Sequence, residues 1–193
     1  MANKAKTATM TSNRNKRIIA REARQKQQRR RRLVYGAIGV VAALVLGALL
    51  VRAILTPKPG EAVASMGNAH IDESQMGQFV YNTTPPTSGP HLGRIARWGV
   101  HTEPIPNELQ LHNLEDGGVM VQYNCPEGCS EMVAQLAEIV TDYDEGVILA
   151  PYPDMNATVA LTAWNRIEKL DGFDQERIQR FIKAYRGIDH HRG

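Results

Sequence analysis

One uninterrupted apolar segment, Leu33–Val51, constrains this 193-residue chain more than any other feature of its sequence. The segment carries no charge over nineteen residues. As a helix rising 1.5 Å per residue it is roughly 28 Å long, about the hydrocarbon thickness of a bilayer. A helix that is apolar on every side lies either in a large protein core or in lipid. A domain of this size cannot bury such a helix beside four arginines, so we expect a transmembrane helix over residues 33–55.

The charges on the two sides of this helix predict its orientation. Residues 1–32 hold twelve Lys or Arg and one acid, whereas residues 56–193 hold ten Lys or Arg and nineteen Asp or Glu. By the positive-inside rule, the N-terminus is cytoplasmic and residues 56–193 are extracytoplasmic, which predicts a single-pass protein of the cell membrane. A cleaved signal peptide is the alternative, because Ala62-Val63-Ala64 fits a cleavage pattern. The long apolar and basic regions before that pattern favour a signal-anchor.

The composition divides the chain into four segments. They are a basic cytoplasmic tail (1–32), the transmembrane helix (33–55), a linker rich in Pro and Gly (56–65) and an extracytoplasmic domain (66–193). Residues 1–28 contain too few large apolar residues to fold alone, although part of Ile18–Arg32 is expected to become helical on the membrane. The predicted partners are the lipid bilayer and anionic lipid at the basic tail. A run of charge alone does not support nucleic-acid binding, and the sequence identifies no protein partner.

The outer segment has the alternating patterns of a mixed domain. Val119–Tyr123, Val147–Ala150 and Thr158–Trp164 have the apolar and β-branched content of strands. Ser130–Tyr143 and Asp174–Tyr185 carry apolar residues at helical spacing. The predicted fold class is therefore α+β, with one N-terminal transmembrane helix followed by a small α+β domain. Residues 187–193 are expected to form a loose tail.

The chain has two cysteines, in Cys125-Pro126-Glu127-Gly128-Cys129. An even pair in an oxidising compartment most simply forms a disulfide. The cysteines also lie after a strand and at the N-terminus of a helix, and a strand, another strand and a helix follow. This is the order of elements in a thioredoxin core, in which the helix N-terminus lowers the pKa of a thiol. The spacing is C-x-x-x-C rather than C-x-x-C, however. A structural disulfide and a thiol-disulfide oxidoreductase both stay open.

All six histidines follow the apolar segment, and imidazole is the commonest metal ligand in proteins. His91 follows a rigid Pro-rich loop, and His112 and Glu115 share a face if their segment is helical. We therefore predict a zinc or copper site built from His70, His91 and His112, with Glu115 or Asp116 completing it. The alternative is that these histidines are loop and core residues satisfied by hydrogen bonds, since no spacing matches a motif such as H-E-x-x-H. No catalytic residue and no organic cofactor site is predicted.

Several motifs together resemble a bacterial family catalogued as domain of unknown function number 3105. They are Tyr81-Asn82, the run PPTSGPH over 85–91, Trp98-Gly99-Val100, Glu103-Pro104, Pro106, the run HNLEDGGV over 112–119, and the later segments 150–153 and 161–164. The resemblance covers roughly residues 66–186. It implies one membrane segment before the domain and no established activity. Its histidine motifs fall on His70, His91 and His112, but Asp116 stands where the family usually has a second histidine, which weakens an all-histidine site.

The sequence thus predicts a membrane-anchored extracytoplasmic domain of uncharacterised activity that binds a transition metal through histidines. Two alternatives come from other classes. One is an extracytoplasmic thiol-disulfide oxidoreductase that uses Cys125 and Cys129, and the other is a non-catalytic interaction domain of the cell envelope.

Overall fold

The computed structural model describes residues 2–55, 57–126, 128–153 and 155–191, and the chain forms two compact units, Met1–Pro57 and Lys58–Gly193. The first unit is one helix, α1 (Ala2–Leu55). Within it, Lys26–Arg52 is long and apolar enough to cross a membrane. The helix begins earlier than expected for residues 1–28. Ala, Lys, Arg and Gln all have high helix propensities, and no Gly or Pro precedes Gly36.

The second unit is built on a six-stranded mixed sheet with the order β1-β8-β7-β5-β6-β4. These strands are β1 (Glu61–Ala62), β4 (Gly99–Val100), β5 (Val119–Tyr123), β6 (Val147–Pro151), β7 (Val159–Ala163) and β8 (Arg166–Leu170). Strand β5 pairs in parallel with β6 and antiparallel with β7, and β7 pairs antiparallel with β8. A separate parallel pair joins β2 (His70–Ile71) to β3 (His91–Leu92). The predicted α+β class is confirmed.

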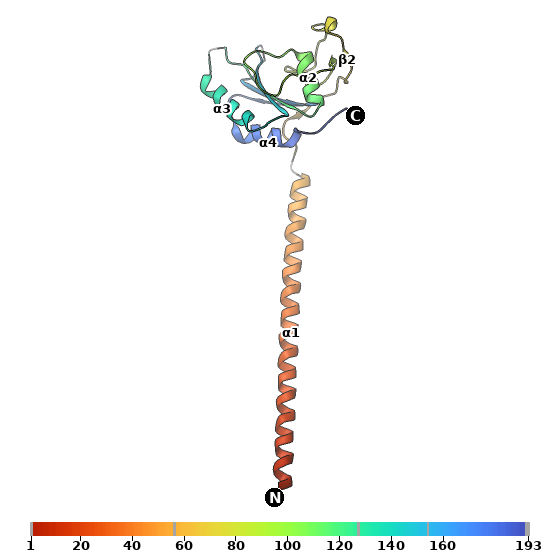
Figure 1. The fold of residues 1–193 in the computed structure, drawn as a ribbon, viewed down its shortest axis with the longest axis vertical. Helices are drawn as coiled ribbons and strands as arrows, with labels where there is room; N and C mark the ends of the chain where they lie inside the picture. The colour runs from red at the N-terminus through yellow and green to blue at the C-terminus, as the bar shows by residue number, and fades with distance from the viewer. Residues whose placement is uncertain (1, 56, 127, 154, 192–193) are drawn as a thin grey trace. The chain divides into compact units, whose positions relative to one another are not determined.

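Helices cover both faces of the six-stranded sheet (Figure 1). On one face, α3 (Ser130–Thr141) and α4 (Gln175–Tyr185) pack against the sheet residues Val119, Val121, Val147 and Leu149. On the other face, Leu111 and Leu114 of α2 (Asn107–Glu115) pack against Met120 and Ile148. Successive residues of a strand point to opposite faces, so strands β5 and β6, which are apolar apart from Gln122, supply both cores.

The order β5-α3-β6-β7-β8-α4 along the chain is the one expected for a thioredoxin-like core. Cys125 and Cys129 form a disulfide between the end of β5 and the start of α3. Cys129 is the N-cap residue of α3, so the disulfide fixes the turn that leads from the sheet into this helix.

The linker expected over 56–65 differs from the structure, because its second half belongs to the domain. Strand β1 pairs antiparallel with β8, and the Val63 amide donates to the Asn165 carbonyl at 3.0 Å. The Pro59 carbonyl accepts a 2.6 Å hydrogen bond from the Tyr185 hydroxyl. A two-residue edge strand needs only backbone hydrogen bonds, so it leaves no apolar pattern in the sequence.

Candidate metal centre

The parallel pair β2–β3 brings His70 and His91 together from positions far apart in the chain. His70 is in register with His91, and the His91 amide donates to the Ala69 carbonyl at 3.0 Å. Residues in register on neighbouring strands project to the same side, and the two ring centroids lie 5.0 Å apart.

The Pro-rich loop before β3 fixes the direction of the His91 ring. The Tyr81 hydroxyl donates to the Pro90 carbonyl at 2.7 Å, and burial raises the pKa of Tyr81, so this donor keeps its proton. Gly89 has a φ of +126°, and a Cβ there would lie 3.0 Å from the Tyr81 ring. Its carbonyl accepts a 2.8 Å hydrogen bond from Nδ1 of His91. The rigid loop predicted from the sequence therefore holds one nitrogen of this buried imidazole.

Helix α2 carries the second half of the site. His112 and Glu115 are three positions apart and lie on the same helical face. Between them, the buried Asn113 side chain accepts from the Ala96 amide at 2.8 Å and donates to the Ala96 carbonyl at 2.9 Å. These two hydrogen bonds fasten the loop at residue 96 to the helix. The rest of α2 is held by Leu111 and Leu114 in the core.

The two glycines after α2 allow close approaches that no other residue permits. Gly117 has a φ of +80°, and a Cβ on it would lie 2.7–2.8 Å from the backbone of Ile188. A Cβ on Gly118 would lie 2.5 Å from the Asn113 carbonyl oxygen and 2.7 Å from the Trp98 ring. The end of α2 can therefore receive the C-terminal segment on one side and an indole ring on the other.

The carboxylate of Glu115 lies at the centre of the site and is 1% exposed. Its Oε1 accepts from Nδ2 of Asn68 at 2.8 Å, and its Oε2 lies 2.9 Å from Nε2 of His91. Burial by itself would raise the pKa of Glu115, but the hydrogen bond from Asn68 and the charge of His91 lower it below its ordinary value. Glu115 is therefore an anion at neutral pH.

Both ring nitrogens of His91 face oxygen acceptors. Nδ1 is the donor to the Gly89 carbonyl, and Nε2 contacts the Glu115 carboxylate.

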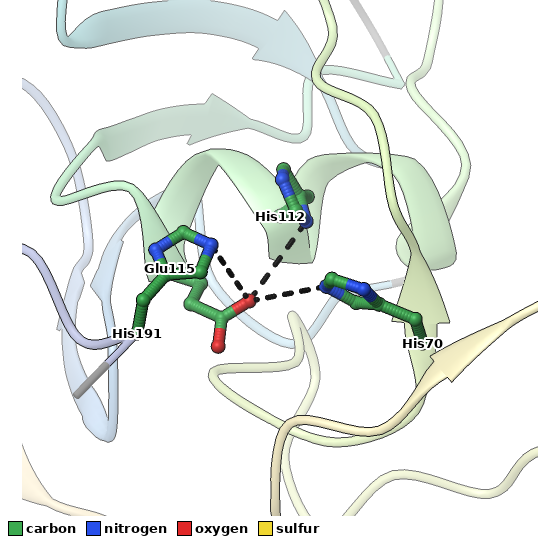
Figure 2. A group of neighbouring side chains, drawn as sticks. All are labelled: His70, His112, Glu115 and His191. Atoms are coloured by element: carbon green, nitrogen blue, oxygen red, sulfur yellow. Dashed lines mark ion pairs between the residues drawn. The ribbon is translucent and has the colours of Figure 1, made fainter. Parts of the chain in front are cut away.

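Three further imidazoles converge on the same Glu115 oxygen (Figure 2). Nε2 of His70 and Nε2 of His191 each lie 3.6 Å from Oε2, and Nδ1 of His112 lies 3.8 Å from it. The candidate ligand atoms of these four residues all lie within 4.8 Å of one another. Nδ1 of His112 is buried and has no hydrogen-bond partner among the described residues. Burial lowers the pKa of His112, so the ring is neutral near pH 7 and keeps a lone pair available.

This group differs from the predicted ligand set. His70, His112 and Glu115 were expected and are brought together. His91 contacts Glu115 from outside the group. Asp116 also lies beside it, at the C-cap of α2, with Oδ1 3.5 Å from Nε2 of His191 and 3.9 Å from Nε2 of His112.

His191 and Asn68 are site residues that the sequence did not indicate. Residues 187–191 are not the loose tail that was expected, because the Gly187 amide donates to the Gly117 carbonyl at 2.7 Å and the His190 amide donates to the Glu115 carbonyl at 2.9 Å. The only indication of His191 in the sequence was that every histidine follows the apolar segment. The cysteine disulfide and His101, which donates to the Arg97 carbonyl, are not part of this group.

The arrangement could hold a divalent cation. Three imidazoles and one carboxylate form a ligand set that zinc and copper accept. Four ligands at 2.0–2.1 Å in tetrahedral geometry lie about 3.3 Å from one another. The separations from Glu115 need to shrink by only a few tenths of an ångström to reach that value. The charges of Glu115 and Asp116 would balance a divalent ion.

Comparison with family models matches residues 72–192 to the family described as "Protein of unknown function (DUF3105)". The matched span contains His91, His112, Glu115 and Asp116, and begins just after His70. No curated protein and no solved structure matches the chain. The motifs that suggested the resemblance lie in this span, and the match covers more than half of the sequence. The chain therefore belongs to the DUF3105 family of proteins of unknown function.

Proposed function

We propose that residues 58–193 form a metal-binding domain that holds zinc through His70, His112, Glu115 and His191. The observation that carries this proposal is the buried Nδ1 of His112, which has no hydrogen-bond partner among the described residues and faces the Glu115 carboxylate beside two further imidazoles. A buried acceptor without a donor is costly, and a metal ion would satisfy it. His91 and Asn68 would orient Glu115 from outside the ligand set, as second partners of metal ligands commonly do.

Metal stoichiometry tests this proposal directly. The full chain in detergent is stripped with a chelator, reloaded with zinc, freed of excess metal and analysed for zinc by mass spectrometry. We expect one zinc per chain in the wild type and in His101→Ala, and much less than one in His112→Ala. His101 is a matched control because its ring contacts a backbone carbonyl outside the site. Retention of full zinc by His112→Ala would refute the assignment. Tighter copper binding in competition would change the metal but keep the site.

We further propose that α1 anchors this domain to the cell membrane, with the basic N-terminus in the cytoplasm beside anionic lipid. Arginine density before the apolar segment supports this orientation. Signal cleavage after Ala64 would remove strand β1, which pairs with β8, and the Pro59 carbonyl that accepts from the Tyr185 hydroxyl. These contacts of the domain argue against such a cleavage. External protease added to intact cells should digest residues 58–193 but spare the N-terminus, and protection of the domain would exclude this topology.

Thiol-disulfide exchange is a second candidate function, supported by the position of the cysteines. Cys125 and Cys129 are half-buried rather than enclosed, and they precede α3 in the order of a thioredoxin-like core. The reduction potential discriminates the two roles. Oxidoreductases lie between about −120 and −270 mV, whereas structural disulfides lie below about −300 mV. A reduction potential below about −300 mV would mean that the Cys125–Cys129 disulfide is structural.

A further inference from the structure

The C-terminal strap, defined as residues 187–191, is fastened to the end of α2. Its Gly187 amide donates to the Gly117 carbonyl and its His190 amide donates to the Glu115 carbonyl. The Glu115 carbonyl belongs to the last turn of α2 and has no partner within the helix, so the His190 amide satisfies a group that would otherwise need water. The His190 ring also stacks on Trp164, with centroids 6.2 Å apart and an interplanar angle of 26°.

The strap delivers the third imidazole of the proposed ligand set in a defined orientation. Nδ1 of His191 lies 2.8 Å from Oδ1 of Asp189, which is two residues earlier in the same strap. The proton on Nδ1 is therefore directed at a carboxylate, and Nε2 faces Glu115. A carboxylate behind an imidazole is the arrangement that commonly orients histidine ligands of metals.

Glu115 and His112 are held far more firmly than His191. Glu115 is 1% exposed and tied by Asn68 and His91, and His112 is 12% exposed on a helix packed in the core. His191 is 38% exposed on a segment that bonds to α2 through two backbone hydrogen bonds. Segments with few buried contacts open locally at a small fraction of the free energy of global unfolding. His70 is 50% exposed, but its strand β2 pairs with the buried strand β3, and its ring lies 5.0 Å from those of His91 and His112. The strap is therefore a part of the site that can open while α2 and the β2–β3 pair stay in place.

We propose that His191 is a displaceable ligand, so that the metal centre has one exchangeable coordination position. This inference rests on the zinc site proposed above. When the strap lifts, His70, His112 and Glu115 keep the ion and the fourth position opens to solvent. Three protein ligands with an open position distinguish reactive metal sites from closed structural ones. The open position takes a monodentate donor of the imidazole class, the same chemistry that His191 provides, from outside the chain.

The test uses the full chain in detergent, loaded with cobalt(II) in place of zinc, and imidazole as the probe. We expect His191→Ala to retain one cobalt per chain, with affinity reduced roughly 10–100-fold, the loss typical of a supporting group rather than an essential one. Its visible absorption should change as solvent replaces the imidazole, and added imidazole should restore the wild-type spectrum. His112→Ala is the matched control, because its site is buried and should neither hold stoichiometric cobalt nor be rescued.

A second variant separates the strap from the ligand itself. Gly117→Ala keeps His191 but places a Cβ 2.7–2.8 Å from the Ile188 backbone, so the strap should detach and the spectrum should match that of His191→Ala. The inference is overturned if His191→Ala has the wild-type spectrum, or if it loses cobalt as completely as His112→Ala. Failure of the wild type to bind any metal would instead overturn the zinc proposal, so the two failures are distinguishable.

Discussion

Thermal stabilisation by zinc gives the sharpest quantitative test of the proposed site. Any ligand that binds only the folded state stabilises it, by about 2.7 kcal/mol when the free ligand is 100-fold above its Kd. Unfolding entropy is roughly 2.1 cal/mol/K per residue, so a unit as long as Lys58–Gly193 has an unfolding entropy of about 0.29 kcal/mol/K. The ratio predicts that zinc raises the Tm of the wild type by roughly 9 °C.

Removing one ligand should abolish most of this shift. Loss of an outer partner typically costs roughly 10–100-fold in metal affinity, so we take about 100-fold as the smallest loss for His112→Ala. At the same zinc concentration the stabilisation then falls to about 0.4 kcal/mol, which is a Tm increase of roughly 1.5 °C. His101→Ala lies outside the site and should keep the full shift.

The assay is intrinsic fluorescence during a thermal ramp, with and without zinc, at fixed protein concentration. Trp164 is a suitable reporter because its ring contacts those of His91 and His190. A shift in His112→Ala that lies within 2 °C of the wild-type value, or loss of the shift in His101→Ala, would falsify the reasoning.

The remaining predictions concern packing, protons and the disulfide. Gly118→Ala would place a methyl group against a backbone carbonyl and an indole ring, and should cost about 1–3 kcal/mol in urea unfolding, whereas Gly172→Ala meets nothing within 4 Å and should be nearly neutral. Burial lowers the pKa of His112, so its lone pair is free at pH 7 and is lost to protonation as the pH falls. Zinc affinity measured by competition should drop roughly 10-fold per pH unit below the pKa of each imidazole ligand. The drop should begin with His191, whose pKa is raised by the hydrogen bond to Asp189, and follow at lower pH for His112. An affinity that stays constant from neutral pH down to the pH at which the domain unfolds would exclude histidine ligation. Reducing the Cys125–Cys129 bond should lower stability by roughly 2 kcal/mol, as expected for so short a loop, and no change in urea midpoint would mean that the bond does not restrain the unfolded chain.

The elements that were predicted from the sequence are those in which neighbouring residues by themselves indicate a buried strand or the start of a helix. Val119–Tyr123 is entirely apolar or β-branched apart from Gln122, and it forms β5 with the predicted bounds. Asp174 was predicted as the start of a helix, and its side chain accepts a hydrogen bond from the Arg177 amide at the beginning of α4. Both signals depend on residues within one turn or one strand.

The elements that were missed depend on pairing with distant residues. Strand β8 carries three charged residues, yet Glu168 is almost buried because Arg177 of α4 donates to it at 2.7–2.8 Å. The strap contains no apolar pattern, and its position follows from carbonyls at the end of α2. His112 and Glu115 were predictable as neighbours from helical spacing. Their meeting with His191 depends on the tertiary structure alone.

The two-residue pairing of β2 with β3 has a consequence for how this protein can vary among its relatives. Side chains alternate along a strand, so deleting or inserting one residue between Gly67 and His70 would turn the imidazole of His70 to the opposite side. Surface loops usually tolerate changes in length more readily than the elements that they connect. Here the reverse should hold, and the segment before β2 should keep its length constant as well as the Asn68 that bonds to Glu115.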